Sequence, residues 1–143
     1  MNPSAPGPHR PAGTVPGAAA LVVLVVDDDA LLRELGVQFL ESLGYRAEAV
    51  GDGEQAVQAV RGGSYDAVLI DYDMPYRDGV SATREIRRMG GKFATLPIIM
   101  VSGRNDASSM AQARAAGVDA YFVKPLRIGV LREALGEVAR RAV

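Results

Sequence analysis

Cysteine is missing from this chain of 143 residues, and its acidic and basic side chains almost cancel to a net charge of −1. Without cysteine the protein has no disulfide bonds, no thiolate metal site and no thiol catalysis, which suits a reducing cytoplasm. A charge so close to zero gives no field that attracts nucleic acid or an anionic lipid surface. The longest apolar run, residues 18–26, is far shorter than the roughly 20 residues of a membrane span. We therefore expect a cytoplasmic protein that binds neither nucleic acid directly nor membranes.

The first seventeen residues, MNPSAPGPHRPAGTVPG, contain five prolines and three glycines. Such a segment cannot bury apolar surface, so we expect a disordered leader or linker over residues 1–17 and no secretory signal peptide. His9, the single histidine of the chain, lies in this segment. The remaining residues, 18–143, have the length of one domain, and an apolar content of 48% is enough to form a core.

Strand-like and helix-like segments alternate from residue 21 onward. The predicted strands are 21–26, 46–50, 67–70, 96–102 and 119–123, and the predicted helices are 30–43, 53–61, 79–89, 106–116 and 128–141. Because parallel strands need helical crossovers, this alternation predicts an α/β fold, an open parallel sheet covered by helices on both faces. Helical spacing predicts buried faces made, in the first and last helices, of Leu32, Leu35, Phe39, Leu40 and Leu43, and of Val130, Leu131, Leu135 and Val138.

Polar side chains follow the ends of four predicted strands. In chain order they are Asp27, Asp28, Asp29, Asp71, Asp73, Ser102 and Lys124. Ligands of open parallel sheets bind at the carboxyl ends of the strands, so we expect these side chains to share one crevice. Crowded carboxylates must take up protons or bind a cation. Oxygen ligands without histidine or cysteine suit Mg²⁺, a carboxylate can attack phosphorus, and a lysine can balance the charge of a phosphoryl group. The sequence thus contains the parts of an aspartyl-phosphate site.

Four motifs, VVDDD, DYDMPYRDG, IIMVSG and AYFVKP, resemble the signatures of the receiver domain of two-component response regulators, the CheY-like family. The resemblance covers residues 20–142. It implies a flavodoxin-like (βα)5 fold, a doubly wound parallel five-stranded sheet with strand order 2-1-3-4-5.

The resemblance also implies a role for each matching residue. Asp71 resembles the phosphoacceptor, Asp28 the direct Mg²⁺ ligand and Asp27 the acid that holds a metal-bound water. Asp73 would offer its backbone carbonyl to the metal, for which Mn²⁺ is an alternative. Ser102 and Lys124 match the phosphoryl-stabilising hydroxyl and ammonium groups, and Tyr121 matches the aromatic residue that switches together with Ser102. The Lys124–Pro125 bond is expected to be cis.

A function follows from these roles. The chain is expected to accept a phosphoryl group on Asp71 from a partner phosphohistidine, in a histidine kinase or a histidine phosphotransfer protein. Phosphorylation of Asp71 should alter the face formed by residues 106–116, 119–123 and 128–141, and this face should bind a downstream protein. The only catalysis expected is self-phosphorylation and self-dephosphorylation at Asp71, so the chain is not expected to be a conventional enzyme. It would be a single-domain response regulator or the receiver of a hybrid histidine kinase.

Two other functions remain open. A receiver-fold module that binds partners without phosphorylation fits the same architecture. A phosphohydrolase of the haloacid-dehalogenase type also places D-x-D at a strand end, although Met74-Pro75 follows here and no cap domain fits in 143 residues.

Some of the candidate residues also have purely structural interpretations. Asp29 is expected to cap the first helix, with Gly44 ending it, and Asp78-Gly79 to form the turn before the third helix. The side chain of Asp73 would then lie in solvent, and Tyr121 would be an ordinary core residue.

Two features depart from the common pattern of the family. The segment RRMGGKFATLP (87–97) is a long, glycine-interrupted connection, which resembles receivers attached to hybrid histidine kinases. Gly103 stands where alanine is frequent and leaves the route to the phosphoryl group open. We further hypothesise that Asp73 and Arg104 pair across the site and shield the acyl phosphate from water.

Overall fold

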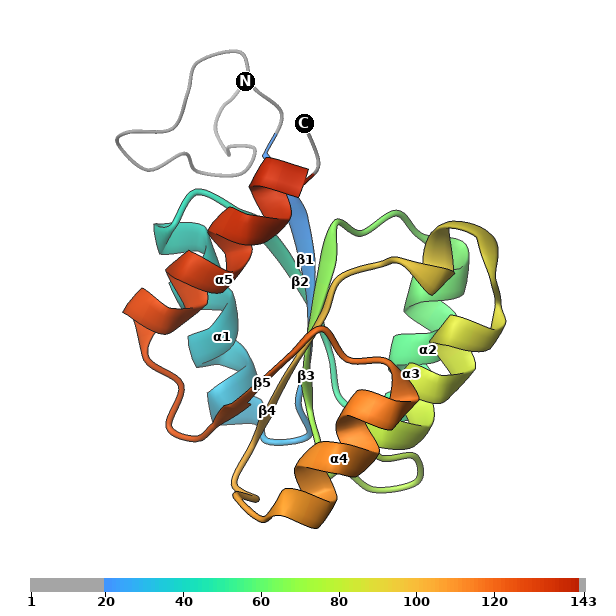
Figure 1. Ribbon diagram of the computed structural model, residues 1–143. Helices are drawn as coiled ribbons and strands as arrows, with labels where there is room; N and C mark the ends of the chain where they lie inside the picture. Colours follow the sequence, from blue (N-terminus) through green and yellow to red (C-terminus); the bar gives the residue numbers. More distant parts are fainter. Residues whose placement is uncertain (1–19, 142–143) are drawn as a thin grey trace.

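Five short parallel strands form one sheet in the order β2-β1-β3-β4-β5 (Figure 1). The strands are β1 Val22–Val26, β2 Arg46–Val50, β3 Ala67–Asp71, β4 Ile98–Ser102 and β5 Ala120–Val123. This computed structural model describes residues 20–141, so the predicted leader over residues 1–17 lies outside the described part. The parallel sheet and the strand order agree with the fold expected from the sequence.

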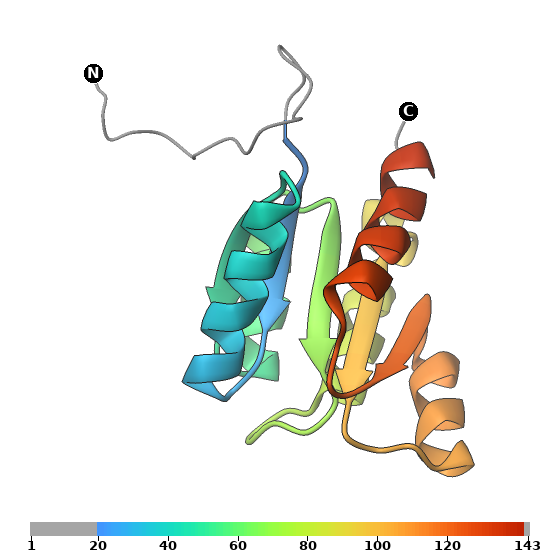
Figure 2. The same ribbon diagram turned by 90° about the vertical axis from the view of Figure 1, so that its left-hand side faces the viewer.

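Helices cover both faces of the sheet. They are α1 Ala30–Ser42, α2 Gly53–Gly62, α3 Gly79–Arg88, α4 Ala107–Ala116 and α5 Ile128–Arg141, with a 3-10 turn, η1 Gly91–Ala94. Helices α1 and α5 lie on one face, and α2, α3 and α4 on the other (Figures 1 and 2). The bounds of the strands and helices differ from the predicted ones by at most two residues, and η1, inside the long 87–97 connection, was not predicted. None of the helices within residues 20–141 has the length and hydropathy of a membrane-spanning segment.

Aspartates cap the first four helices, and glycines with positive φ follow α1 and α4. The side chains of Asp29, Asp52, Asp78 and Asp106 accept hydrogen bonds from main-chain N–H groups in the first turns of α1, α2, α3 and α4. Gly44 and Gly117, which follow α1 and α4, have φ of +96° and +116°, a conformation that favours glycine. The predictions for Asp29, Gly44 and Asp78 are therefore confirmed.

Strand residues point alternately into two cores. Val23 and Val25 of β1 pack with Leu40, Leu131 and Leu135 under α1 and α5. Residues of the opposite register, such as Leu24 and Val26, pack under α2, α3 and α4. This alternation decides on which side of the sheet each polar residue at a strand end emerges.

The predicted buried face of α1 is wrong in part. Leu40 is the one fully buried residue of α1, whereas Leu32 and Leu35 are 39% and 37% exposed. Val130 of α5 is likewise 37% exposed, although Leu131, Leu135 and Val138 are buried as predicted. The physical reason for α1 is that α1 and α5 stand apart over the sheet (Figure 2), so α5 leaves the apolar stripe of α1 uncovered. Val130 faces the β5 edge instead, beside Phe122 and Glu133.

Candidate functional site

Three charged residues meet at the carboxyl edge of the sheet because of strand register and pleat. Strands β1, β3 and β4 end at the same level of the sheet, because Val26 pairs with Ile70 and Asp71 pairs with Val101. Asp27 directly follows β1. Asp27 and Asp71 continue the alternation of residues that face α1 and α5. Lys124 does the same beyond Phe122 on β5. All three side chains therefore emerge on the α1/α5 side of the sheet.

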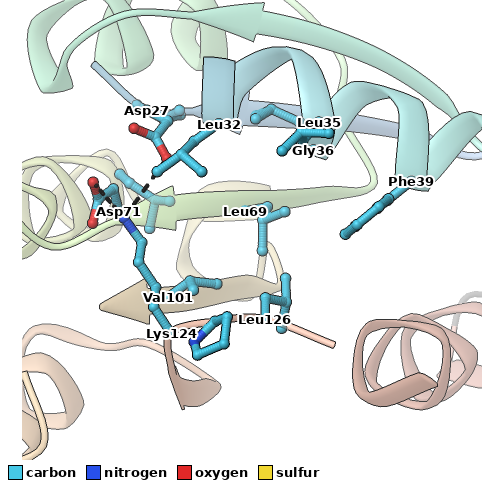
Figure 3. A pocket seen from close by; sticks show the side chains of 14 residues that line it. Asp27, Leu32, Leu35, Gly36, Phe39, Leu69, Asp71, Val101, Lys124 and Leu126 are labelled. Atoms are coloured by element: carbon cyan, nitrogen blue, oxygen red, sulfur yellow. Dashed lines mark ion pairs between the residues drawn. The ribbon is translucent and has the colours of Figure 1, made fainter. Parts of the chain in front are cut away.

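The distances within this cluster are short. Carboxylate oxygens of Asp27, Asp28 and Asp71 lie within 4.8 Å of one another. The ammonium nitrogen of Lys124 lies 3.1 Å from Oδ2 of Asp71 and 3.9 Å from Oδ2 of Asp27 (Figure 3). The Lys124–Pro125 bond is cis, as expected. The residues predicted to form the charged centre of the site therefore do meet in space.

Burial sets the electrostatics of this cluster. The side chains of Asp27 and Asp71 are only 12% and 8% exposed. Burial raises the pKa of both carboxyl groups above the ordinary 3.8. Lys124 acts in the opposite direction on each of them, yet the net pKa shift remains upward. A second cation would therefore be favourable here, because the ammonium group alone does not offset the burial of two acids.

The end of β3 is fixed by a close approach of α3. A Cβ added at Gly79 would overlap the main-chain carbonyl oxygen of Asp71, and the N–H of Gly79 donates to the carbonyl of Tyr72 at 2.8 Å. The Asp78 side chain caps the same helix by accepting from the N–H of Ser81 at 2.8 Å. The Asp-Gly pair of the DYDMPYRDG motif thus anchors the segment that carries Asp71.

The two predicted switch residues emerge on the opposite side of the pleat. Ser102 continues the register of Ile98 and Met100, and Tyr121 packs against the same core under α4. Ser102 is fully buried, and its hydroxyl accepts a hydrogen bond from the N–H of Arg104 at 2.9 Å. The hydroxyl of half-buried Tyr121 donates to the carbonyl of Arg104 at 2.8 Å.

Asp73 is exposed and forms the predicted ion pair with Arg104, at 2.6 Å between Oδ1 and Nη2. The hydrogen bonds from Arg104 hold the pKa of Asp73 below its usual range, and those to Asp73 raise the pKa of Arg104. Whether this pair shields an acyl phosphate stays a prediction.

Sequence reasoning missed a groove that opens beside the charged cluster (Figure 3). This apolar groove, of about 480 Å³, runs between α1 and the β5–α5 connection over the sheet. It is lined mainly by Leu32, Leu35, Phe39, Leu69, Val101 and Leu126, and it reaches Asp27, Asp71 and Lys124. Its only sequence signal was an excess of leucine on α1, which helical spacing alone assigns to the core.

Sequence reasoning also missed Arg33, whose Nη1 donates to the carbonyl oxygen of Asp27 at 2.8 Å. A basic residue one helical turn after Asp29 was the available signal for this contact.

The donors of the charged cluster fit a magnesium ion. All the side-chain donors of Asp27, Asp28 and Asp71 are carboxylate oxygens, the ligands that Mg²⁺ prefers. One of these side chains, that of Asp28, is exposed, which leaves the cluster open to water and to phosphate oxygens.

Comparison with known proteins identifies a single family. A family model described as the response regulator receiver domain matches residues 23–136. Among curated proteins, the sensor histidine kinase RcsC of Salmonella typhimurium is 34% identical over 121 residues, covering 85% of this chain and 12% of that protein. The transcriptional regulatory protein ResD of Bacillus subtilis is 38% identical over 103 residues, covering 72% of this chain and 41% of that protein. The chain thus spans less than half the length of each of these relatives.

Solved structures agree with the family match. The receiver domain of the sensor histidine kinase PA1611 from Pseudomonas aeruginosa is 34% identical with a TM-score of 0.77, over 83% of this chain and 97% of that one. That crystal structure contains a magnesium ion coordinated in the active site cleft. The receiver domain of the Francisella response regulator 1452 is 27% identical with a TM-score of 0.78, over 86% of this chain and 99% of that one.

Proposed function

The chain belongs to the response regulator receiver domain family of two-component signalling, and from this premise we propose that Asp71 is its phosphoacceptor. One observation carries the proposal: the Asp71 carboxylate lies both within the three-carboxylate cluster and 3.1 Å from the Lys124 ammonium group. A nucleophilic carboxylate beside one cation and a second, metal-binding pair of acids is the arrangement that phosphoryl transfer needs.

In the proposed reaction a carboxylate oxygen of Asp71 attacks phosphorus. The new O–P bond forms while the N–P bond to the imidazole of the donor breaks, and the imidazole leaves with the bonding electron pair. Lys124 stays close to the acceptor oxygens and balances the charge that the phosphoryl group brings. Hydrolysis reverses the switch, because water attack on the same phosphorus returns the Asp71 carboxylate and inorganic phosphate.

Magnesium would be held by the side chains of Asp28 and Asp71 and by the backbone carbonyl of Asp73, and Asp27 would hold it through a water molecule. When bound, Mg²⁺, or Mn²⁺ in its place, offsets the charge of the carboxylates and of the phosphoryl oxygens. The residues themselves do the positioning: the α3 contact at Gly79 fixes the Asp71 main chain, and Arg33 holds the Asp27 carbonyl.

The donor of the phosphoryl group is proposed to be a histidine kinase or a histidine phosphotransfer protein. His9 is the only histidine of the sequence, and it lies outside the described residues. None of the described residues can supply an imidazole, so we propose that the donor histidine belongs to the partner. The apolar groove lies between α1 and the β5–α5 connection, and Leu31, at 67% exposure, belongs to α1. They offer the donor an apolar surface beside Asp71.

We propose that a downstream protein binds the face formed by α4, β5 and α5, which carries Tyr121. Phosphorylation would draw Ser102 toward Asp71, and Tyr121 would follow and change the affinity of this face for a downstream protein. The relatives include both sensor histidine kinases and transcriptional regulatory proteins. We therefore propose that the receiver domain, taken to span residues 18–143, serves either in a hybrid histidine kinase or as a response regulator. We place it in the cytoplasm, in line with the absence of cysteine.

The test is labelling with acetyl phosphate that carries ³²P. Wild-type protein is expected to incorporate label only with Mg²⁺ or Mn²⁺ present, and Asp71→Asn is expected to abolish incorporation. Asp66→Asn is the matched control, because Asp66 lies at the other end of β3, where its carboxylate accepts from the N–H of Val22 at 2.7 Å. Equal labelling of Asp71→Asn and wild type would refute the assignment.

Two alternative functions give different results in the same assay. A binding module independent of phosphorylation would show no labelling of wild type and no response to beryllofluoride, a phosphoryl analogue. A phosphohydrolase would release phosphate from small phosphate esters over many turnovers.

A further inference from the structure

Arg33 of α1 contacts the turn between β1 and α1, which carries two acids of the charged cluster. Its Nη1 donates to the main-chain carbonyl oxygen of Asp27 at 2.8 Å. The main-chain N–H of Asp27 donates to the carbonyl of Val50, the last residue of β2, at 3.3 Å. The main chain of Asp27 is therefore held by the neighbouring strand through its N–H group and by Arg33 through its carbonyl group.

Side-chain hydrogen bonds complete the arrangement of this turn. Oδ1 of Asp27 accepts from the N–H of Asp29 at 2.9 Å, so Oδ2 is the oxygen that faces Lys124, at 3.9 Å. Arg33 binds the carbonyl oxygen of the peptide group that joins Asp27 to Asp28. Because a peptide group is planar, this one hydrogen bond also fixes the direction in which the main chain enters Asp28.

The charge of Arg33 is not paired with the acids of the cluster. None of the ion pairs within residues 20–141 includes Arg33, whereas Lys124 pairs with both Asp27 and Asp71. The acceptor of Arg33 is a carbonyl oxygen, which carries no net charge. Arg33 therefore supports the position of the turn, and its positive charge taken alone would repel a divalent cation.

Gly51, which directly follows β2, leaves space for the guanidinium group of Arg33. A Cβ added at Gly51 would lie 3.3 Å from Nη1 of Arg33, closer than an ordinary van der Waals contact. The N–H of Gly51 donates to Oε1 of Gln55 at 2.7 Å, so the main chain at this position is itself held in place. A methyl group at residue 51 would thus press on the guanidinium group and disturb its bond to Asp27.

Building on the proposed magnesium site, we propose that Arg33 is a positioning residue for magnesium binding. By holding the Asp27 carbonyl, Arg33 keeps Asp27 and Asp28 where their carboxylate oxygens lie within 4.8 Å of that of Asp71. Without this bond the turn gains conformational freedom that metal binding must remove again, so the affinity for Mg²⁺ falls.

The test is an NMR titration of the metal-free protein with MgCl₂. Arg33→Met removes the donor and the charge from a side chain of similar shape, and its affinity for Mg²⁺ is expected to fall about tenfold. Arg33→Lys keeps an N–H donor and should recover most of this loss. Arg46→Met is the matched control, because it removes an exposed cation at the other end of β2, where Arg46 pairs with Val22. This control should bind Mg²⁺ as wild type does.

The direction of the change separates positioning from charge. Removal of a nearby cation would by electrostatics alone strengthen the binding of Mg²⁺. Unchanged or tighter binding by Arg33→Met therefore overturns the proposal, and so does a loss that Arg33→Lys does not reverse. A merely structural role would lower the melting temperature of the metal-free protein and leave the Mg²⁺ affinity of the folded protein unchanged.

Gly51→Ala reaches the same contact without a change at Arg33. It is expected to weaken Mg²⁺ binding less than Arg33→Met does, and to add nothing in the double variant, because both substitutions disturb one hydrogen bond. Fully additive losses would count against the proposal. Labelling by acetyl phosphate at saturating Mg²⁺ should reach the wild-type rate in every variant. Failure of the proposed function looks different, because wild type itself would then show no binding of Mg²⁺ at Asp28 and Asp71.

Discussion

At the scale of single residues, the two buried carboxylates of the charged cluster lower the stability of the folded protein. Asp27 and Asp71 are both carboxylates and both nearly buried, and only one ammonium group, that of Lys124, is paired with them among the described residues. Burial raises the pKa of each acid, even against the opposing effect of Lys124. Ionising them is therefore harder in the folded protein than in the unfolded chain. Native stability falls as the pH rises through these raised pKa values.

We predict that Asp71→Asn raises the melting temperature in magnesium-free buffer at pH 7, because it removes one of the two buried charges. The gain in melting temperature should shrink as the pH falls. It should vanish below the ordinary carboxyl pKa of 3.8, where this carboxyl group is protonated in both the folded protein and the unfolded chain. Differential scanning calorimetry over this pH range measures the effect. Glu133→Gln, at an exposed acid of α5, is the control and should change little. A lower melting temperature for Asp71→Asn at pH 7 would contradict this account of the cluster.

The positions of the residues in the charged cluster could be predicted from the sequence, but the contacts in the neighbouring β4–α4 loop could not. Asp27, Asp71 and Lys124 were predictable because strand register and the two-residue pleat fix where a strand-end side chain emerges. The contact of the Arg104 main chain with Ser102 and Tyr121 was not predictable. It depends on the path of a short loop, which no periodic pattern in the sequence describes.

At the scale of the elements, helix bounds followed from local chemistry, whereas helix exposure did not. Asp29 and Gly44 mark the ends of α1 in the sequence because capping depends on neighbouring residues only. The exposure of Leu32 and Leu35 depends on how far α5 stands from α1, and that distance is set by tertiary packing. The turn η1 was missed for a related reason, since Arg87, six residues before Phe93, holds it in place from α3.

Arg87 joins three segments through main-chain carbonyl groups. Its guanidinium donates to the carbonyls of Phe93, Leu96 and Gly117 at 2.6–3.0 Å, and it also pairs with Asp119 at 3.1 Å. The side chain is only 16% exposed. We predict that Arg87→Ala lowers the free energy of unfolding by about 2–4 kcal/mol, because several partly buried carbonyls lose a charged donor.

Chemical denaturation measures this loss, and the adjacent Arg88 supplies a matched control. Arg88 is 71% exposed and makes a single ion pair with Glu85, so Arg88→Ala should change the unfolding free energy by less than about 1 kcal/mol. Equal effects of the two substitutions would show that the Arg87 contacts do not hold η1 and the α4–β5 connection together.

At the scale of the whole molecule, the sheet separates the charged cluster and the apolar groove from the two predicted switch residues. The charged cluster and the apolar groove lie on the side of α1 and α5, whereas Ser102 and Tyr121 belong to the side of α4. Under the proposed function, the donor protein and the switch residues would therefore approach Asp71 from opposite sides of the sheet. Substitutions in the groove should consequently affect the donor step and leave the chemistry of the acceptor intact.

We predict that Leu31→Ser combined with Leu35→Ser slows labelling by a phosphorylated histidine phosphotransfer protein about tenfold or more, while labelling by acetyl phosphate stays at the wild-type rate. Both leucines are exposed, at 67% and 37%, so the change removes apolar docking surface and little core packing. A small phosphodonor needs no docking surface and serves as the internal control. Val123→Ser, at a residue of β5 that is 41% exposed, is the control on the output face and should leave both rates unchanged. Equal slowing with both phosphodonors would mean that the α1 leucines support the acceptor site itself, and the separation of the two sides would then fail.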